Sequence, residues 1–309
     1  MGDPVLSALG EIVPLGLRRR ELRREGRWLR WIEVGEGYPP VVAVAGLGEP
    51  GSLAWAGILS AVATQARILA YDRAGTGASD AITAQTMDDQ VEDLAAVIAS
   101  AGDSGCIIAG HSWGGLLAQV VAWRHPDLVV GLVLVDPADE RFSVTLPEEQ
   151  HKQRREMDQM LLDLHHRGEL RDTIRAMSQA SAEQLSSDPR VREQLLAAWE
   201  WCYSTSSQVQ SVPDERRVMA SSLAQIASER AAAVRLRIPV TILSATKGMP
   251  DELRQRLTGF HAELASAVPG SRHVVLPDTG HAINEEQPEA VADAITLMAI
   301  SIRNRDGQP

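Results

Sequence analysis

The sequence predicts an α/β protein with a mostly parallel, doubly wound sheet that is interrupted by one helical insertion. Short β-branched runs alternate with amphipathic segments through residues 1–139 and again through 236–309, as in a parallel sheet covered by helices. Residues 140–235 contain few β-branched runs and have helical periodicity. We therefore expect one α/β core, formed by 1–139 and 236–309, and an inserted helical domain at 140–235.

The first part of the core is expected to supply most of the sheet. Val41–Ala45 is a β-branched run that stops at a Gly-Leu-Gly turn, which is typical of a buried strand. Apolar residues between 87 and 100 recur at helical spacing and predict an amphipathic helix. In chain order, the expected strands are 27–33, 41–45, 67–71, 106–109 and 129–135, and the expected helices are 52–64, 87–100 and 114–124.

A basic run lies before these elements. Seven arginines occur between Arg18 and Arg30, and Glu21 and Glu25 interrupt them. Mixed charges of this kind are typical of a solvent-exposed helix. We expect a solvated helix there, followed by the first strand.

The strand–helix alternation resumes after the insertion. Pro147, Pro189 and Pro213 are expected to divide the insertion into separate helices, because a proline usually ends a helix. Beyond it, the expected strands are 238–243 and 272–276, and the expected helices are 251–267 and 288–303.

Charge and cysteine content exclude several classes of protein. Acidic residues outnumber basic ones by 41 to 30, which argues against a nucleic-acid partner. Two cysteines cannot form a disulfide framework, and no apolar stretch is long enough for a membrane span. No pair of histidines has the spacing of a metal site. We expect a cytoplasmic protein without metal or cofactor, and the sequence predicts no particular oligomeric state.

A candidate nucleophile lies where the strand at 106–109 turns into the next helix. Gly110-His111-Ser112-Trp113-Gly114 fits the pattern G-x-S-x-G and follows a buried apolar run. Small residues on both sides allow a sharp turn that lifts Ser112 Oγ clear of the sheet edge, while His111 is expected to point away. The hydroxyl of such a serine requires a base to remove its proton.

The candidate base is His281. It follows the last expected strand on a loop that contains glycine, so it should lie at the same edge of the sheet as Ser112. The loops at the carboxyl edge of a parallel sheet are the segments that carry ligands and chemistry. We therefore expect the His281 imidazole to accept the proton of the Ser112 hydroxyl.

Four motifs together resemble the α/β-hydrolase family, and they occur in the order typical of that family. They are Ala45-Gly46-Leu47-Gly48, Asp72-Arg73-Ala74-Gly75-Thr76-Gly77-Ala78-Ser79, Gly110-His111-Ser112-Trp113-Gly114-Gly115, and Gly280-His281 followed by Glu286-Gln287-Pro288. The resemblance covers nearly the whole chain and implies Ser112 as nucleophile and His281 as base. It also implies an oxyanion hole formed by the backbone N–H groups of Leu47 and Trp113. The family often has His-Gly where this chain has Ala45-Gly46, a change we expect to be mild because the backbone N–H groups bind the oxyanion.

The acid that would orient His281 has more than one candidate position. Family members commonly carry it just after the strand at 240–243, where this chain has Asp251 only after an intervening glycine and proline. Other members carry it after the strand that follows the nucleophile helix, which is the position of Asp136. We favour Asp136 because it lies at the same sheet edge as the nucleophile. Asp251 is the alternative, and Asp139 is a third candidate.

The insertion at 140–235 corresponds to the helical cap that covers the active site in the resembling family. We expect Trp55, Trp199, Trp201 and Tyr203 to form a wall for the substrate. The negative net charge indicates no cationic subsite for a strongly anionic ligand. The sequence therefore predicts a small-molecule substrate that is medium-sized and mainly apolar.

Three functions are compatible with these residues. The leading one is a serine hydrolase that cleaves an ester, thioester, lactone or amide through an acyl-enzyme. The second is an acyltransferase or a cyclising thioesterase that uses the same residues. The third is a ligand-binding protein of this fold without catalysis. Relatives such as epoxide hydrolases and dehalogenases have an aspartate at the nucleophile position, so Ser112 argues against those two reactions.

Overall fold

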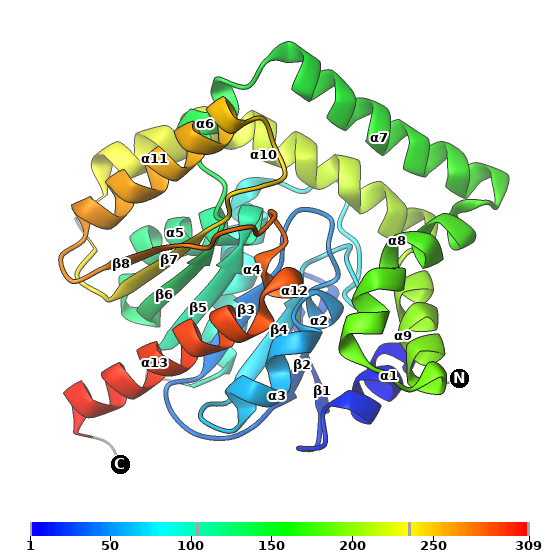
Figure 1. Ribbon diagram of the computed structural model, residues 1–309, viewed down its shortest axis with the longest axis horizontal. Coiled ribbons are helices and arrows are strands. Elements are labelled where there is room, and N and C mark those ends of the chain that lie inside the picture. The colour runs from blue at the N-terminus through cyan, green and yellow to red at the C-terminus, as the bar shows by residue number, and fades with distance from the viewer. Residues whose placement is uncertain (1, 103–104, 234–235, 308–309) are drawn as a thin grey trace.

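The computed structural model describes residues 2–102, 105–233 and 236–307, which form an α/β fold around an eight-stranded sheet (Figure 1). Its strands are β1 (Arg18–Arg24), β2 (Arg27–Val34), β3 (Val41–Val44), β4 (Ile68–Asp72), β5 (Cys106–His111), β6 (Val129–Val135), β7 (Val240–Ser244) and β8 (Arg272–Val275). They run in the order β1-β2-β4-β3-β5-β6-β7-β8. β2 is antiparallel to β1 and β4, and the pairs from β4 to β8 are parallel. The mostly parallel α/β class expected from the sequence is confirmed.

Helices cover both faces of this sheet. Outside the insertion they are α1 (Pro4–Ile12), α2 (Gly51–Ala54), α3 (Ala56–Ala63), α4 (Met87–Ser100), α5 (Ser112–Arg124), α11 (Asp251–Ala267), α12 (Ile283–Glu286) and α13 (Pro288–Asp306). Successive side chains of a strand point to opposite faces. In β3, Ala43 therefore packs in a cluster with residues of α1, α3 and α13, whereas Val42 packs in a second cluster with residues of α4 and α5. These two apolar layers make the sheet doubly wound.

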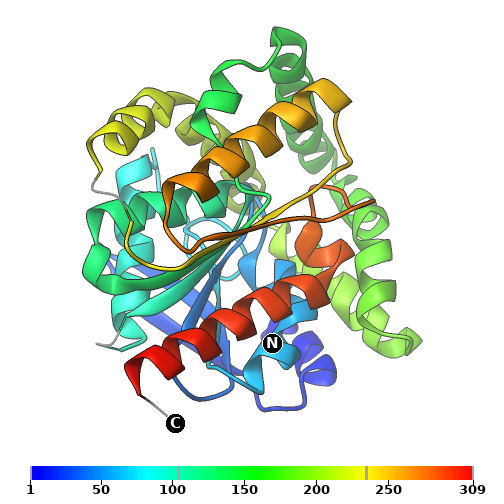
Figure 2. The same ribbon diagram turned by 60° about the vertical axis from the view of Figure 1, so that its left-hand side comes forward.

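A helical insertion joins β6 to β7. It consists of α6 (Glu140–Val144), α7 (Glu148–Arg167), α8 (Leu170–Leu185), α9 (Pro189–Cys202) and α10 (Ser206–Ala232). Figures 1 and 2 show these helices gathered at one end of the sheet, and α7 lies outside α10. We call α6–α10 the cap. The expected end of the insertion at residue 235 lies outside the described residues, as do the chain ends at 1 and 309.

The basic run at 18–30 forms a β-hairpin, so the expected solvated helix is wrong. β1 and β2 are joined by a two-residue turn at Glu25 and Gly26, whose φ values of 49° and 84° suit a tight antiparallel turn. Four of its arginines reach carboxylates of other segments. Arg27, for example, donates to Asp93 at 2.6 Å.

Two other expectations differ from the structure. The helix expected over 52–64 is divided near Trp55 into the short helices α2 and α3. Pro213 lies inside α10, although it was expected to end a helix. A proline removes one backbone hydrogen bond, but a helix can continue past it where packing holds the flanking turns. α1 and β1 have no counterpart among the elements predicted from the sequence.

A buried ion pair joins the cap to the core. Glu215 of α10 and Arg73, which follows β4, are 0% and 2% exposed. Arg73 donates from Nε and Nη2 to the Glu215 carboxylate at 2.6 and 2.7 Å. Arg73 also donates to the carbonyl oxygens of Ala45 and Gly46 at 2.6 Å each, and Glu215 accepts the N–H of Gly48 at 2.6 Å. The pair therefore fixes the loop after β3 against the cap.

We expect Glu215→Ala to lower the free energy of unfolding by about 3–5 kcal/mol, because it leaves the Arg73 guanidinium buried without a counter-charge. Urea denaturation at neutral pH measures the loss. The control is Glu156→Ala, which removes a carboxylate from an exposed pair with Lys152 in α7 and should have a much smaller effect. Similar small losses in both variants would contradict the role assigned to the buried pair.

Candidate active site

The candidate nucleophile sits at the junction of β5 and α5. Ser112 has a φ of 50°, a left-handed conformation that is strained for a residue with a Cβ. A Cβ on Gly114 would lie 2.5 Å from the carbonyl oxygen of Ala45, and a Cβ on Gly110 would lie 2.6 Å from that of Gly114. Such contacts are too short for any residue larger than glycine. The glycines around Ser112 therefore allow the sharp turn that holds its side chain at the sheet edge.

Three side chains form a continuous chain of contacts at the carboxyl edge of the sheet. His281 Nε2 lies 2.9 Å from Ser112 Oγ, and His281 Nδ1 lies 2.6 Å from Asp136 Oδ2. Asp136 directly follows β6. His281 lies in the loop between β8 and α12, where Thr279 accepts the backbone N–H of Thr246 at 2.9 Å. With the proton of His281 on Nδ1, Nε2 can accept the hydroxyl proton of Ser112.

The carboxylate of Asp136 is fully buried, and several donors compensate its charge. Arg254 of α11 donates from Nη1 to Oδ1 and Oδ2 at 2.9 and 2.8 Å, and the N–H of Ala245 donates to Oδ1 at 3.0 Å. Burial alone would raise the pKa of Asp136. The hydrogen bond and charge of His281, together with the charge of Arg254, outweigh burial and hold this pKa well below its ordinary value. Asp136 is therefore ionised at neutral pH.

The two other candidate acids lie elsewhere. Asp251 is the first residue of α11 and is exposed, and it makes no hydrogen bond to His281. Asp139 caps the N-terminus of α6 and pairs with the Arg141 guanidinium at 2.8 Å. Of the three carboxylates considered from the sequence, Asp136 is the one that the structure brings to His281.

The amides expected to form an oxyanion hole belong to residues that line the same cavity as Ser112. The N–H of Trp113 is in the first turn of α5, where helix amides have no intrahelical acceptor. The N–H of Leu47 has no hydrogen-bond partner within the described ranges. Tyr203 fixes the Leu47 loop further, because its hydroxyl donates to the carbonyl oxygen of Gly48 at 3.0 Å. Both amides are thus free to donate to a ligand.

A cavity of about 340 Å³ adjoins Ser112 and His281. This volume falls in the range of small-molecule sites, roughly 300–1,000 Å³. Two cations of the cap, Arg154 and Arg216, also line it, whereas the negative net charge had indicated no cationic subsite. Six apolar side chains that also line it are called the apolar wall below: Phe142, Leu146, Met219, Met249, Leu253 and Leu257.

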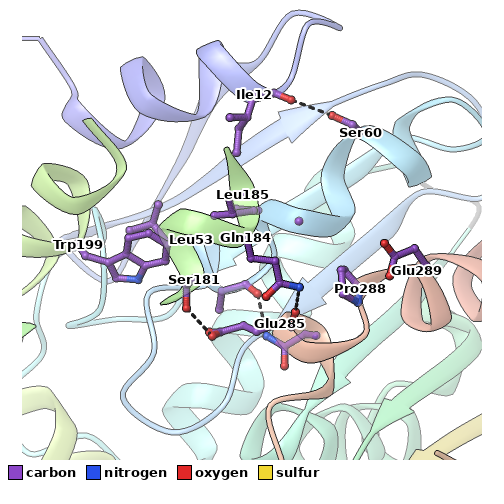
Figure 3. A pocket seen from close by; sticks show the side chains of 14 residues that line it. Ile12, Leu53, Ser60, Ser181, Gln184, Leu185, Trp199, Glu285, Pro288 and Glu289 are labelled. Carbon is purple, nitrogen blue, oxygen red and sulfur yellow. Dashed lines mark hydrogen bonds between the residues drawn. The ribbon is translucent and has the colours of Figure 1, made fainter. Parts of the chain in front are cut away.

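The aromatic residues expected to contact the substrate lie away from this cavity. Trp55 is fully buried in the core, and Trp201 and Tyr203 line a different cleft beside α8 and α9. Trp199 lines a third cavity, where Figure 3 shows it at one side and Pro288 at the other. The structure therefore does not bring these four side chains to the nucleophile. Their positions are explained by packing of the cap helices against the core.

A second charged pair lies beside the three side chains described above. His111 lines the cavity, although it was expected to point away. Its Nδ1 lies 3.3 Å from Glu49 Oε2, and its Nε2 lies 2.9 Å from the carbonyl oxygen of His281. Burial opposes both charges, but the attraction between the two groups outweighs it. This attraction lowers the pKa of Glu49 to about 2 and raises the pKa of His111. The pair thus connects the loop after β3 to the loop of His281.

Sequence reasoning missed Arg254, Glu49 and Arg154. Arg254 and Arg154 each lie in a helix with many charged residues, and no local pattern separates a charge that faces a site from one that faces water. Glu49 did carry a signal, because it directly follows the Gly-Leu-Gly turn at the expected edge of the site. Within the part of the chain that the structure describes, no group of three His, Cys, Asp or Glu side chains could hold a metal ion.

We expect Glu49→Gln to reduce stability most between about pH 4.5 and 6.5, where the pair with His111 is charged. The pKa of Glu49 is lowered on folding, so its contribution is complete above the ordinary value of 4.5 and is lost as the pH falls toward about 2. The pKa of His111 is raised on folding, so its contribution is complete below the ordinary value of 6.5 and is lost as the pH rises through the raised pKa.

Urea unfolding of the parent and variant at a series of pH values measures this difference in the free energy of unfolding. Glu36→Gln, which removes a carboxylate from the exposed surface, controls for the change in net charge. A parent–Glu49→Gln difference that stays constant across the whole pH series would contradict the charged pair.

The sequence and the structure both match known proteins. A sequence model of the Alpha/beta hydrolase family matches residues 41–294. Lipase LipV of Mycobacterium tuberculosis is 42% identical over 71 residues, which cover 23% of this chain and 27% of that protein. Epoxide hydrolase 4 of Mus musculus is 28% identical over 119 residues, which cover 37% of this chain and 33% of that protein. The chain thus spans about a third or less of the length of these two relatives.

The fold of this chain is also similar to that of solved structures over nearly its whole length. The crystal structure of the Cif epoxide hydrolase from Acinetobacter nosocomialis matches with a TM-score of 0.74 and 19% identity, covering 96% of this chain and 97% of that chain. No helix in the described ranges is both long and apolar enough to cross a membrane. The family match begins at β3, ends within α13 and includes the whole cap. The chain belongs to the alpha/beta hydrolase family.

Proposed function

We propose that the protein is a serine hydrolase that cleaves a carboxylic ester, or a related thioester, lactone or amide, through an acyl-enzyme. The observation that carries the proposal is the chain of contacts from Ser112 to His281 to Asp136, at 2.9 and 2.6 Å, beside a cavity. Membership of the family supports hydrolysis as the reaction class. The chemical identity of the nucleophile, a serine hydroxyl, favours cleavage of a bond to a carbonyl carbon.

In the first step, Ser112 Oγ attacks the carbonyl carbon of the substrate and its proton passes to His281 Nε2. The imidazolium that forms is stabilised by the buried Asp136 carboxylate, which stays ionised because its pKa is low. The negative charge that develops on the carbonyl oxygen would be accepted by the N–H groups of Leu47 and Trp113. Donors in such positions contribute roughly 3–4 kcal/mol each to stabilising a tetrahedral intermediate.

In the second step, the tetrahedral intermediate collapses and the bond to the leaving group breaks. His281 Nε2 returns its proton to the leaving alcohol, thiol or amine, and the acyl group remains on Ser112. A water molecule then gives its proton to Nε2 as its oxygen attacks the acyl carbon. His281 Nε2 gives this proton to Ser112 Oγ as the bond between Oγ and the acyl carbon breaks, which releases the carboxylic acid and restores the hydroxyl.

Two of the similar proteins are named epoxide hydrolases. A serine nucleophile supports attack on a carbonyl carbon rather than the opening of an epoxide. An aspartate carboxylate can open an epoxide and form an ester that water then cleaves. A serine would form an ether, which has no carbonyl carbon for water to attack. The apolar wall supports a medium-sized, mainly apolar substrate, because burial of its hydrocarbon surface is favourable.

We expect a fluorophosphonate probe to label the protein once, and Ser112→Ala to abolish both labelling and hydrolysis of a p-nitrophenyl ester. Asp136→Asn should lower kcat by about 10,000-fold, because the amide stabilises the wrong tautomer of His281. Asp251→Asn is the matched control and should retain parent activity, since Asp251 lies on the surface. Mass spectrometry and steady-state kinetics provide the readouts.

Failure of the parent protein to react with the probe would overturn the activated serine. Parent-like turnover in Asp136→Asn together with collapse in Asp251→Asn would assign the acid to Asp251 instead. Product analysis with competing alcohols and amines separates hydrolysis from acyl transfer or cyclisation. Ester binding without labelling or turnover would identify a ligand-binding member of the family.

A further inference from the structure

We propose that Arg154 binds a carboxylate of the substrate, at the end remote from the bond that Ser112 attacks. This inference rests on the proposed function and specifies its substrate class: an acyl compound that is apolar along its length and anionic at its far end.

Arg154 is a cation that forms no close ion pair with any residue that the structure describes. It is half-buried in α7 and lines the cavity that contains Ser112. Its side chain forms no hydrogen bond and no ion pair within 4.0 Å of any described residue. The carboxylate one helical turn further along, Asp158, is taken by Arg216, which donates to it from Nε and Nη2 at 2.6 and 3.0 Å. Asp158 thus attracts both guanidinium groups but is hydrogen-bonded by Arg216 alone, so the Arg154 guanidinium is left without a hydrogen-bonded carboxylate.

The charges around the cavity orient such a ligand. Glu49 lines the cavity beside His111, the residue before Ser112, and its pKa of about 2 keeps it negative at neutral pH. Because Glu49 is paired with His111, a carboxylate of the substrate would gain no attraction there, whereas the guanidinium of Arg154 on the cap would attract it. The electrically favoured arrangement therefore has the reacting carbonyl at Ser112, hydrocarbon against the apolar wall, and the anion at Arg154.

The position of Arg154 provides room for the anionic group. Arg154 also lines a cavity of about 450 Å³ between α7 and α10, and the two cavities share Ser143, Arg216 and Met219. Burial and the nearby charge of Arg216 lower the pKa of Arg154, and a bound carboxylate would offset both effects. The planar guanidinium can hold a carboxylate through two parallel hydrogen bonds, which favours this anion over a neutral amide or ester.

The test compares p-nitrophenyl half-esters of linear dicarboxylic acids, from succinic to sebacic acid, with the same compounds methylated on the remote carboxylate. We expect the parent protein to have the higher kcat/KM for the half-ester at one favoured chain length. In Arg154→Gln, the ratio of kcat/KM for half-ester over methyl ester should fall about 10- to 100-fold, as expected for loss of a hydrogen-bonded charge pair. Arg154→Lys should retain part of the preference. The matched control is Lys152→Gln, which removes the same charge from the same helix at an exposed position.

A binding measurement separates this inference from the proposed function. Calorimetry on Ser112→Ala, with and without Arg154→Gln, compares the affinities for the half-ester and the methyl ester without turnover. Equal affinities, or a preference that Arg154→Gln leaves unchanged, would overturn the carboxylate site even if the protein hydrolyses esters. A preference that depends on Arg154, in a protein that hydrolyses none of the esters, would support the site and overturn the hydrolase.

Discussion

The buried carboxylate of Asp136 is the constraint on which the candidate site depends. A carboxylate removed from water requires compensating charge and donors, because an unpaired buried charge is strongly destabilising. Arg254 of α11, the N–H of Ala245 after β7, and His281 after β8 supply them. Each partner belongs to a different segment, so satisfying one charge fixes several segments relative to one another. The same contacts place His281 Nε2 beside Ser112.

The fold and the tight turn that carries Ser112 could be predicted because their signals are local. β-branched runs alternate with amphipathic segments along the chain. Ser112 is flanked by glycines, as a very tight turn requires. The pair between Glu49 and His111 could not be predicted in this way, because the two residues are 62 positions apart. The distance between them is set by the order of β3 and β5 in the sheet, which no local pattern specifies.

The two clearest differences between prediction and structure have a common physical cause. The run at 18–30 has a charge pattern compatible with a helix, but pairing of its strands and contacts with distant acids such as Asp93 decide its conformation. Trp199 and Trp201 lie in the cap as expected, yet their helix, α9, directs them toward other cavities. In both cases tertiary contacts, which composition and spacing do not encode, determine which way a side chain faces.

The ion pair between Arg73 and Glu215 means that the cap is not an interchangeable module. Replacing α10 with a helix that lacks a glutamate at position 215 would leave Arg73 without its counter-charge and the N–H of Gly48 without its acceptor. Both losses fall on the loop that carries Leu47, so a chimaera with a new pocket could lose the position of this candidate oxyanion donor. A cap exchange in this protein therefore requires that the incoming helix carry a glutamate at the position of Glu215, or that Arg73 be replaced as well.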